Sequence, residues 1–258
     1  MGVSISVSVF DEATSTSDLA RQALADGAMS GTAFQALIQT KGRGRHGRFW
    51  VSPKGNLYLS VVFLPTRPMM EWPGVSLVVS VALAKTLDQV ITPNRVSLKW
   101  PNDVLVDGKK TAGILIEAHE KGMIIGVGVN MISAPEVTEG GWPAICLSDA
   151  IKAGEDETAS AEIVSLDAFR DLLINEMEAA LSHWQDNGFE GCMLEWMARA
   201  AFLGQKIYIQ DDEDDTLEGV FRGINPDGTM RLELAGGDML SLAAGDVKRA
   251  RPVASLGN

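Results

Sequence analysis

The sequence predicts an α+β fold, in which a large domain of strands and helices is followed by a small β-barrel. Three observations support this prediction. Several stretches have the period or the apolar character of strands, longer apolar stretches have the length and spacing of helices, and after Gly204 the chain changes to short strands separated by turns. At 258 residues and 46% hydrophobic content, the chain can form one substantial core and a small second one.

The first two predicted elements are a strand and a helix. The strand is predicted because apolar residues alternate with serines at Val3, Ile5, Val7 and Val9. Helical spacing begins after a hydroxyl-rich segment, and one of Ser15, Thr16 or Ser17 should cap this helix by accepting a hydrogen bond from a backbone N–H. Capping accounts for only one hydroxyl, and facing a polar ligand is an equally good interpretation of the others.

Two strands are predicted on either side of a glycine- and arginine-rich loop, over residues 32–40 and 57–64. Trp72-Pro73 then opens an apolar stretch to Val90, whose length and early proline favour a buried helix over a strand. The other elements of the large domain follow from similar signals. A strand is stopped by Pro101, with Asn102 and Asp103 in the bend, and hairpin turns at Asp107-Gly108 and Lys121-Gly122 flank a strand over 111–118. They are followed by a strand over 123–131, a loop with a short helix over 133–158, and helices over 166–187 and 190–202.

The carboxy-terminal segment reads as a barrel of short strands. Strands are predicted over residues 206–210, 217–223, 230–234 and 238–242, with turn signals between them.

The most informative stretch is the glycine- and arginine-rich loop. It contains no acidic residue, and none occurs from Gly27 to Met70 in a chain of net charge -12. Glycines let the backbone bend while the charges converge, so this pattern is typical of a site that binds a compact anion. The loop places four cations within eight residues and separates them with three glycines: Lys41, Arg43, Arg45 and Arg48, with Gly42, Gly44 and Gly47.

Three other interpretations of this loop are weaker. Residues 42–47 match the letters of the dinucleotide fingerprint G-x-G-x-x-G, but Phe49-Trp-Val-Ser-Pro53 follows where that motif needs a helix. Arginine-glycine segments of RNA-binding tails repeat within disordered sequence, whereas this one occurs once between apolar runs. A solvated loop without function is the default for a charge run, but Gln39 and Trp50 frame this one too specifically.

Composition and missing motifs narrow the class of protein. A sequence pI near 4.7 argues against nucleic acid as a partner, and the longest apolar run, residues 74–84, is shorter than the about 20 residues that span a membrane. Walker A, G-x-S-x-G and H-E-x-x-H motifs are absent, and the histidines are too scattered for a metal centre, so no metal ligand is predicted. Isolated Cys146 and Cys192, with no signal-peptide segment, indicate the cytoplasm.

Three motifs in a fixed order add a resemblance to a known family. They are the loop Gly42-Arg-Gly-Arg-His-Gly47 with Trp50 and Asn56-Leu-Tyr-Leu-Ser60, then Lys99-Trp-Pro-Asn-Asp103, then Lys110-Thr-Ala-Gly-Ile-Leu-Ile-Glu117 with Gly126-Val-Gly-Val-Asn130. With these motifs the chain resembles the biotin protein ligases, that is, the biotin–[acetyl-CoA-carboxylase] ligase family, over essentially its whole length. The resemblance implies a catalytic domain of the biotin/lipoate ligase type over residues 1–203, with a mixed sheet and flanking helices, and an SH3-like barrel over residues 204–258.

Two departures from the family pattern qualify the resemblance. Ser17 stands where the family commonly has asparagine, which leaves the role of this residue open. The amino terminus starts directly in the first strand, so the resemblance implies the monofunctional form without the DNA-binding domain.

The resemblance also implies a reaction and a set of site residues. Biotin and ATP, with Mg²⁺ sharing the phosphate charge, would give biotinyl-5′-adenylate and pyrophosphate, and a lysine of a biotin carboxyl carrier protein would then attack the adenylate. Asp103 would orient or deprotonate that lysine, or would merely cap a turn. When the functional residues of the family are matched to this sequence, the resemblance implies three sets of site residues. They are Ser15, Thr16, Ser17, Gln39, Gly42, Arg43, Gly44, Arg45 and Lys110 for biotin binding; Arg48, Trp50, Asn102 and Asn130 for nucleotide binding; and Lys110, Arg45, Arg48 and Asp103 for catalysis.

Two other functions remain open on the sequence. Lipoate or octanoate protein ligases and transferases share the related fold, although they lack this arginine-glycine loop with a downstream Lys-Trp-Pro-Asn motif. A non-enzymatic adenylate-binding protein is the second alternative, and transfer of labelled biotin to a carrier domain would exclude it.

Overall fold

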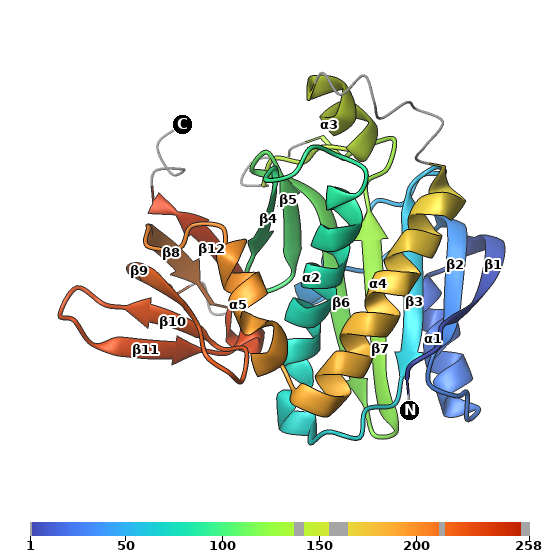
Figure 1. The fold of residues 1–258 in the computed structure, drawn as a ribbon, viewed down its shortest axis with the longest axis horizontal. Helices are drawn as coiled ribbons and strands as arrows, with labels where there is room; N and C mark the ends of the chain where they lie inside the picture. Colours follow the sequence, from blue (N-terminus) through green and yellow to red (C-terminus); the bar gives the residue numbers. More distant parts are fainter. Residues whose placement is uncertain (1, 137–141, 155–164, 212–214, 254–258) are drawn as a thin grey trace.

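The computed structural model describes residues 2–136, 142–154, 165–211 and 215–253. A seven-stranded sheet with helices on both faces forms the larger part, and a separate five-stranded sheet forms the carboxy-terminal part (Figure 1). The strand order of the large sheet is β1-β2-β3-β7-β6-β5-β4, and its strands are β1 (Ser6–Ala13), β2 (Thr32–Gln39), β3 (Leu57–Phe63), β4 (Val96–Lys99), β5 (Asp103–Val106), β6 (Lys109–His119) and β7 (Gly122–Val129).

The large sheet is mixed, because β1 and β2 pair in parallel while the other neighbours pair antiparallel. The predicted α+β class with a mixed sheet and flanking helices is therefore confirmed. The small sheet is antiparallel in the order β11-β10-β9-β8-β12, with strands β8 (Lys206–Gln210), β9 (Thr216–Ile224), β10 (Met230–Glu233), β11 (Met239–Leu242) and β12 (Arg249–Pro252).

Alternation along β3 shows how the sheet separates two apolar layers. Val61 and Phe63 belong to the main core under the long helices, whereas Val62 between them belongs to a small cluster with Ala20 and Leu24. Helix α1 therefore covers one face, and α2 and α4 cover the other (Figure 1). The helices are α1 (Thr16–Ala25), α2 (Val75–Asp88), α3 (Leu147–Ala153), α4 (Leu166–Asn187) and α5 (Glu190–Ala198), with 3₁₀ turns η1 (Arg45–Gly47), η2 (Met69–Gly74) and η3 (Ala244–Asp246).

Several elements that were predicted from local sequence signals are present in the structure. Ser15 caps α1 by accepting from the N–H of Ser17, and the turn Asp107-Gly108 has both residues at positive φ, as a tight hairpin requires. The short helix expected within residues 133–158 is α3, although positions 137–141 and 155–158 of that stretch lie outside the described residues.

Three predictions need correction, and one strand was missed. The first strand begins at Ser6 instead of Val3 and continues to Ala13, because backbone pairing with β2 extends along this length. Asp103 does not lie in the bend after Pro101 but opens β5, where it pairs with Gly113 of β6. Helix α2 begins at Val75, and Trp72-Pro73 lie in the preceding 3₁₀ turn. Strand β12 was not predicted, since its sequence Arg-Ala-Arg-Pro lacks apolar alternation and its partner β8 is distant in the chain.

The small sheet is joined to the large domain next to the Lys-Trp-Pro-Asn-Asp segment. The buried indole of Trp100 donates to the carbonyl of Gly228 at 3.1 Å, and the backbone of Leu98 bonds with Arg199 just before the small sheet. Val247 and Lys248, just before β12, accept hydrogen bonds from Arg45 and Arg48 of the arginine-glycine loop, so that both domains contribute to one cavity.

Candidate functional site

A cavity of about 350 Å³ lies between the large sheet, the start of α1, the arginine-glycine loop and the residues around β12. All but one of the site residues expected from the sequence line it. The lining set includes Ser15, Thr16, Ser17, Gln39, Arg43, Gly44, Arg45, Arg48, Trp50, Asn102, Asp103, Lys110 and Asn130, whereas Gly42 does not line the cavity.

One end of the cavity is a buried network of neutral polar groups. The side-chain oxygen of Gln39 accepts from the backbone N–H of Thr16 at 2.8 Å and from its hydroxyl at 3.1 Å, and the amide nitrogen of Gln39 donates to Ser52 at 2.9 Å. Ser60 on β3 lies 2.8 Å from the hydroxyl of Thr16 and 3.3 Å from that of Ser17. Ser15 caps the helix, and Thr16 and Ser17 line the cavity wall.

The arginine-glycine loop is a short hairpin closed by its own backbone. The N–H of Trp50 donates to the carbonyl of Gly42 at 2.9 Å, and the N–H of Gly44 donates to that of Arg48 at 2.8 Å. A Cβ on Gly42 would lie 2.5 Å from Ser52 Oγ and closer still to the carbonyl oxygen of Trp50, so close packing requires glycine here. Gly42 therefore shapes the loop instead of lining the cavity.

The three arginines of the loop point to different partners. Arg45 donates to the carbonyls of Ala244 and Val247, the latter at 3.1 Å, and Arg48 donates to the carbonyl of Lys248 at 3.3 Å. The guanidinium of Arg43 instead pairs with two carboxylates on the opposite side of the loop. The sequence predicts that the charges of the loop converge on an anion, whereas the charge of Arg43 is paired with these two carboxylates.

Asp103 lies between two lysines on the cavity wall. Its carboxylate is almost fully buried, forms an ion pair with Lys110, and lies 3.2 Å from the ammonium of Lys99. Burial acts to raise the pKa of Asp103, but the charges of Lys110 and Lys99 outweigh burial and hold this pKa well below its ordinary value. Burial also lowers the pKa of Lys99, and Asp103 opposes that effect. Asp103 is therefore ionised at neutral pH and anchors two cations.

Glycines of β6 and β7 form a floor on which Trp50 lies. A Cβ on Gly128 would come within 2.7 Å of the Trp50 ring, and one on Gly113 within 3.0 Å. The ammonium of Lys110 lies 5.2 Å from the centre of the same ring. The indole nitrogen of Trp50 is buried and donates to no protein group among the described residues, so it can donate to a ligand.

The two asparagines of the site hold backbone as well as lining the cavity. Asn102 donates to the carbonyl of Ile114 at 2.9 Å and its oxygen lies 3.4 Å from Arg45, while Asn130 donates to the carbonyl of Lys110 at 3.4 Å. Lys110 is thus positioned by Asn130 through the backbone and by Asp103 through the side chain.

Sequence reasoning missed several residues of this cavity. Trp142 lines it with its ring centre 5.1 Å from the ammonium of Lys99, and no motif surrounds Trp142 in the sequence. The residues 247–251 around β12 also line the cavity, and among them burial, with the charges of Arg249 and Arg48, lowers the pKa of Arg251. A basic cluster at the end of an acidic chain was the available signal for these residues.

Within the described ranges, no group of three or more His, Cys, Asp or Glu side chains could hold a metal ion. No helix in the part of the chain that the structure covers has the length and apolar character needed to cross a membrane.

Comparison with known proteins by sequence matches two family models and several curated relatives. Residues 9–130 match the model of the biotin/lipoate A/B protein ligase family, and residues 202–248 match the biotin protein ligase C terminal domain. The chain is 31% identical over 242 residues to the biotin--[acetyl-CoA-carboxylase] ligase of Mycobacterium tuberculosis, covering 92% of this chain and 86% of that protein. It is 34% identical over 230 residues to the biotin--[acetyl-CoA-carboxylase] ligase of Paracoccus denitrificans, covering 84% of this chain and 90% of that protein.

A solved structure supports the fold. The biotin protein ligase from Aquifex aeolicus, determined in complex with biotin and ATP, superposes with a TM-score of 0.79 at 24% identity and covers 95% of this chain and 98% of that one.

Proposed function

The chain belongs to the biotin protein ligase family, and from this premise we propose that it activates biotin with ATP as biotinyl-5′-adenylate and transfers the biotinyl group to a lysine of a biotin carboxyl carrier protein. One observation supports the proposal most directly. A single cavity joins a neutral polar end, a central lysine held by a buried carboxylate, and a cationic side formed by both domains. Such a cavity suits a ligand with a polar head, a reacting carboxylate and a polyphosphate.

The neutral end suits the biotin head group. Thr16, Gln39 and Ser60 already form a hydrogen-bonded network there, so their donors and acceptors are fixed in place before a ligand arrives. Lys110 lies farther along the cavity wall, between Trp50 and Asp103. In this arrangement Lys110 would hold the carboxylate of biotin and then stabilise the oxygen that gains charge as the mixed anhydride forms and breaks.

The cationic side suits the phosphates of ATP. Arg45 and Arg48 donate to backbone carbonyls of the small domain, and these contacts hold both guanidinium groups on the cavity wall. Bringing a carboxylate against a triphosphate is opposed mainly by charge repulsion, and fixed cations lower that barrier. Mg²⁺ would enter bound to the ATP phosphates as part of the substrate, because Asp103, the carboxylate that lines the cavity, is already paired with two lysines.

The environment of Asp103 supports one of its possible roles. A carboxylate whose pKa is held far below its ordinary value is a weak base and would not remove a proton from a lysine ammonium. Asp103 would instead position Lys110 and attract the ammonium of the incoming lysine of the carrier protein. It is not a turn cap, because it begins β5.

The experiment that tests this function is transfer of labelled biotin to a purified carrier domain with MgATP. A carrier domain whose acceptor lysine is replaced by arginine is the control, and it should remain unlabelled. The melting temperature should also rise more with biotin and MgATP than with lipoate and MgATP. Equal or reversed shifts, or transfer of lipoate in preference to biotin, would favour lipoate ligation, and adenylate binding without transfer would favour a binding protein.

A further inference from the structure

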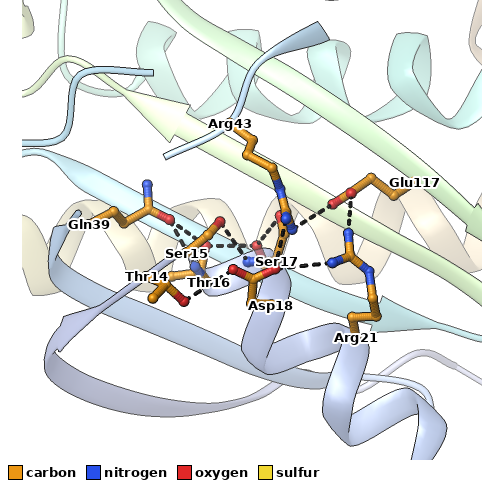
Figure 2. A network of polar contacts seen from close by, with 10 residues as sticks. Thr14, Ser15, Thr16, Ser17, Asp18, Arg21, Gln39, Arg43 and Glu117 are labelled. Atoms are coloured by element: carbon orange, nitrogen blue, oxygen red, sulfur yellow. Dashed lines mark hydrogen bonds and ion pairs between the residues drawn. The ribbon is translucent and has the colours of Figure 1, made fainter. Parts of the chain in front are cut away.

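Four charged side chains form a cluster beside the neutral end of the cavity (Figure 2). Arg43 lies 2.7 Å from Asp18 and 3.7 Å from Glu117, and Arg21 lies 3.0 Å and 2.6 Å from the same two carboxylates. Each arginine thus bridges both acids. We call these residues, Asp18, Arg21, Arg43 and Glu117, the four-charge cluster.

The cluster joins three elements. Asp18 is in the first turn of α1, directly after the hydroxyls that line the cavity, and Glu117 is near the end of β6. Arg43 belongs to the arginine-glycine loop, which on its other side is bonded through Arg45 and Arg48 to backbone carbonyls around η3 and the start of β12. The loop is therefore tied to the large domain by Arg43 and to the small domain by its other two arginines.

The surroundings of Arg43 make these carboxylates important for its position. Only about a third of its side chain is exposed, and its Nε and Nη2 atoms are buried without a hydrogen bond, as is Oε2 of Glu117. A cation in this setting depends on its two counter-ions, because its nitrogens are largely removed from water. If the loop lifted from the cavity, Arg43 would have to leave both carboxylates.

From these contacts we propose that Asp18 and Glu117 are positioning residues, which act through Arg43 to hold the arginine-glycine loop closed over the cavity. This inference rests on the proposed function in one respect: a closed loop would retain the reactive adenylate until the carrier lysine arrives. The closure itself does not depend on the identity of the ligand.

The test is a double-mutant cycle with Asp18→Asn, Arg43→Ala and the combined variant. Asp26→Asn is the matched control, since Asp26 is an exposed acid at the other end of the same helix, where its carboxylate accepts from Gln22. The first readout is amide hydrogen exchange over residues 41–49 in the ligand-free protein, which needs no turnover. The second is the rate at which bound biotinyl-5′-adenylate is released from the enzyme, followed with labelled biotin.

The expected result is an increase of about tenfold in both rates for Asp18→Asn and for Arg43→Ala, with no further increase in the combined variant. Asp26→Asn should behave as the unmodified protein. If Asp18→Asn raises the two rates by the same factor whether or not Arg43 is present, Asp18 acts by stabilising the start of α1 and not through Arg43, and the inference is wrong. Unchanged exchange and release in Asp18→Asn would also overturn it.

Two further measurements keep the outcomes distinct. If Asp18→Asn does not fold, Glu117→Gln replaces it in the same cycle, because Glu117 reaches Arg43 from β6 independently of α1. Biotin transfer by the unmodified protein is measured in the same preparation. Failure of that transfer would count against the proposed function. Normal transfer by the unmodified protein, together with unchanged amide exchange of the loop in Asp18→Asn and Glu117→Gln, would count against this inference alone.

Discussion

The ammonium of Lys99 lies 3.2 Å from the carboxylate of Asp103, inside the wall of a cavity in which the same carboxylate also holds Lys110. Two cations therefore depend on one buried anion. The arrangement places positive charge at the centre of the cavity, and it explains why a single acid can be important for both stability and ligand binding.

Asp103→Asn should lower the free energy of unfolding by about 3 kcal/mol at neutral pH, because it leaves two poorly solvated ammonium groups without their counter-ion. Asp107→Asn on the same hairpin is the control. Asp107 pairs with Arg95 at the surface, and its positive φ suits asparagine, so the loss there should be below about 1 kcal/mol. Urea denaturation measures both, and equal losses would contradict the central role of Asp103.

The same carboxylate predicts how stability depends on pH. The folded-state pKa of Asp103 lies below its ordinary value of 3.8, so its contribution is fully present above that pH and is lost as the pH falls through the folded value. The stability difference between the unmodified protein and Asp103→Asn should therefore be constant from neutral pH down to about 4 and shrink at lower pH. A difference that already disappears well above 3.8 would show that Asp103 is not held ionised.

Lys110→Ala should reduce the rate of adenylate formation by about 10² to 10³, the typical cost of losing one fixed electrostatic contact to the transition state. Folding should be little affected, because Asp103 keeps Lys99 as a partner. Lys109→Ala is the matched control, since Lys109 is exposed on the neighbouring position of β6. The rate of pyrophosphate release in a single turnover is measured for both variants. Similar rates for Lys110→Ala and Lys109→Ala would show that Lys110 has no role in adenylate formation.

Gly42→Ala should destabilise the protein by about 1–3 kcal/mol and weaken biotin binding, because the new methyl group would collide with the backbone of Trp50 and with Ser52. Gly44→Ala, two residues away, would meet only Arg48 at 3.4 Å and should keep nearly the original melting temperature. Thermal unfolding compares the two variants. A Gly42→Ala protein as stable as Gly44→Ala would mean that the loop has another closed conformation available.

Residues 41–49 should exchange their amide hydrogens more slowly when biotin or the adenylate is bound. Even with Arg43 paired, a loop with three glycines can open transiently in the absence of ligand, and a bound ligand adds contacts that keep it closed for longer. Hydrogen exchange with and without ligand measures this effect, with α4 as an internal reference. The same protection in both states would exclude a lid role.

Much of the fold could be predicted from the sequence because its signals are local. The helix predicted over residues 166–187 has those bounds in the structure, where Ser165 caps its start and Gly188 ends it at positive φ. The Asp107-Gly108 turn and the three ordered motifs are equally local, and most of the residues that line the cavity belong to those motifs. Residue type and spacing thus determined the elements, the turns and the family.

Only the tertiary structure decided which charges meet. Arg43 pairs with Asp18 across 25 residues of sequence, and Asp103 is held between two lysines instead of lying free in a bend. Strand β12 and Trp142 reach the cavity through packing that no local pattern announces. The physical reason is that an ion pair depends on distance and burial, which are set by how whole elements pack, whereas a helix or a turn depends on residues close together in the chain.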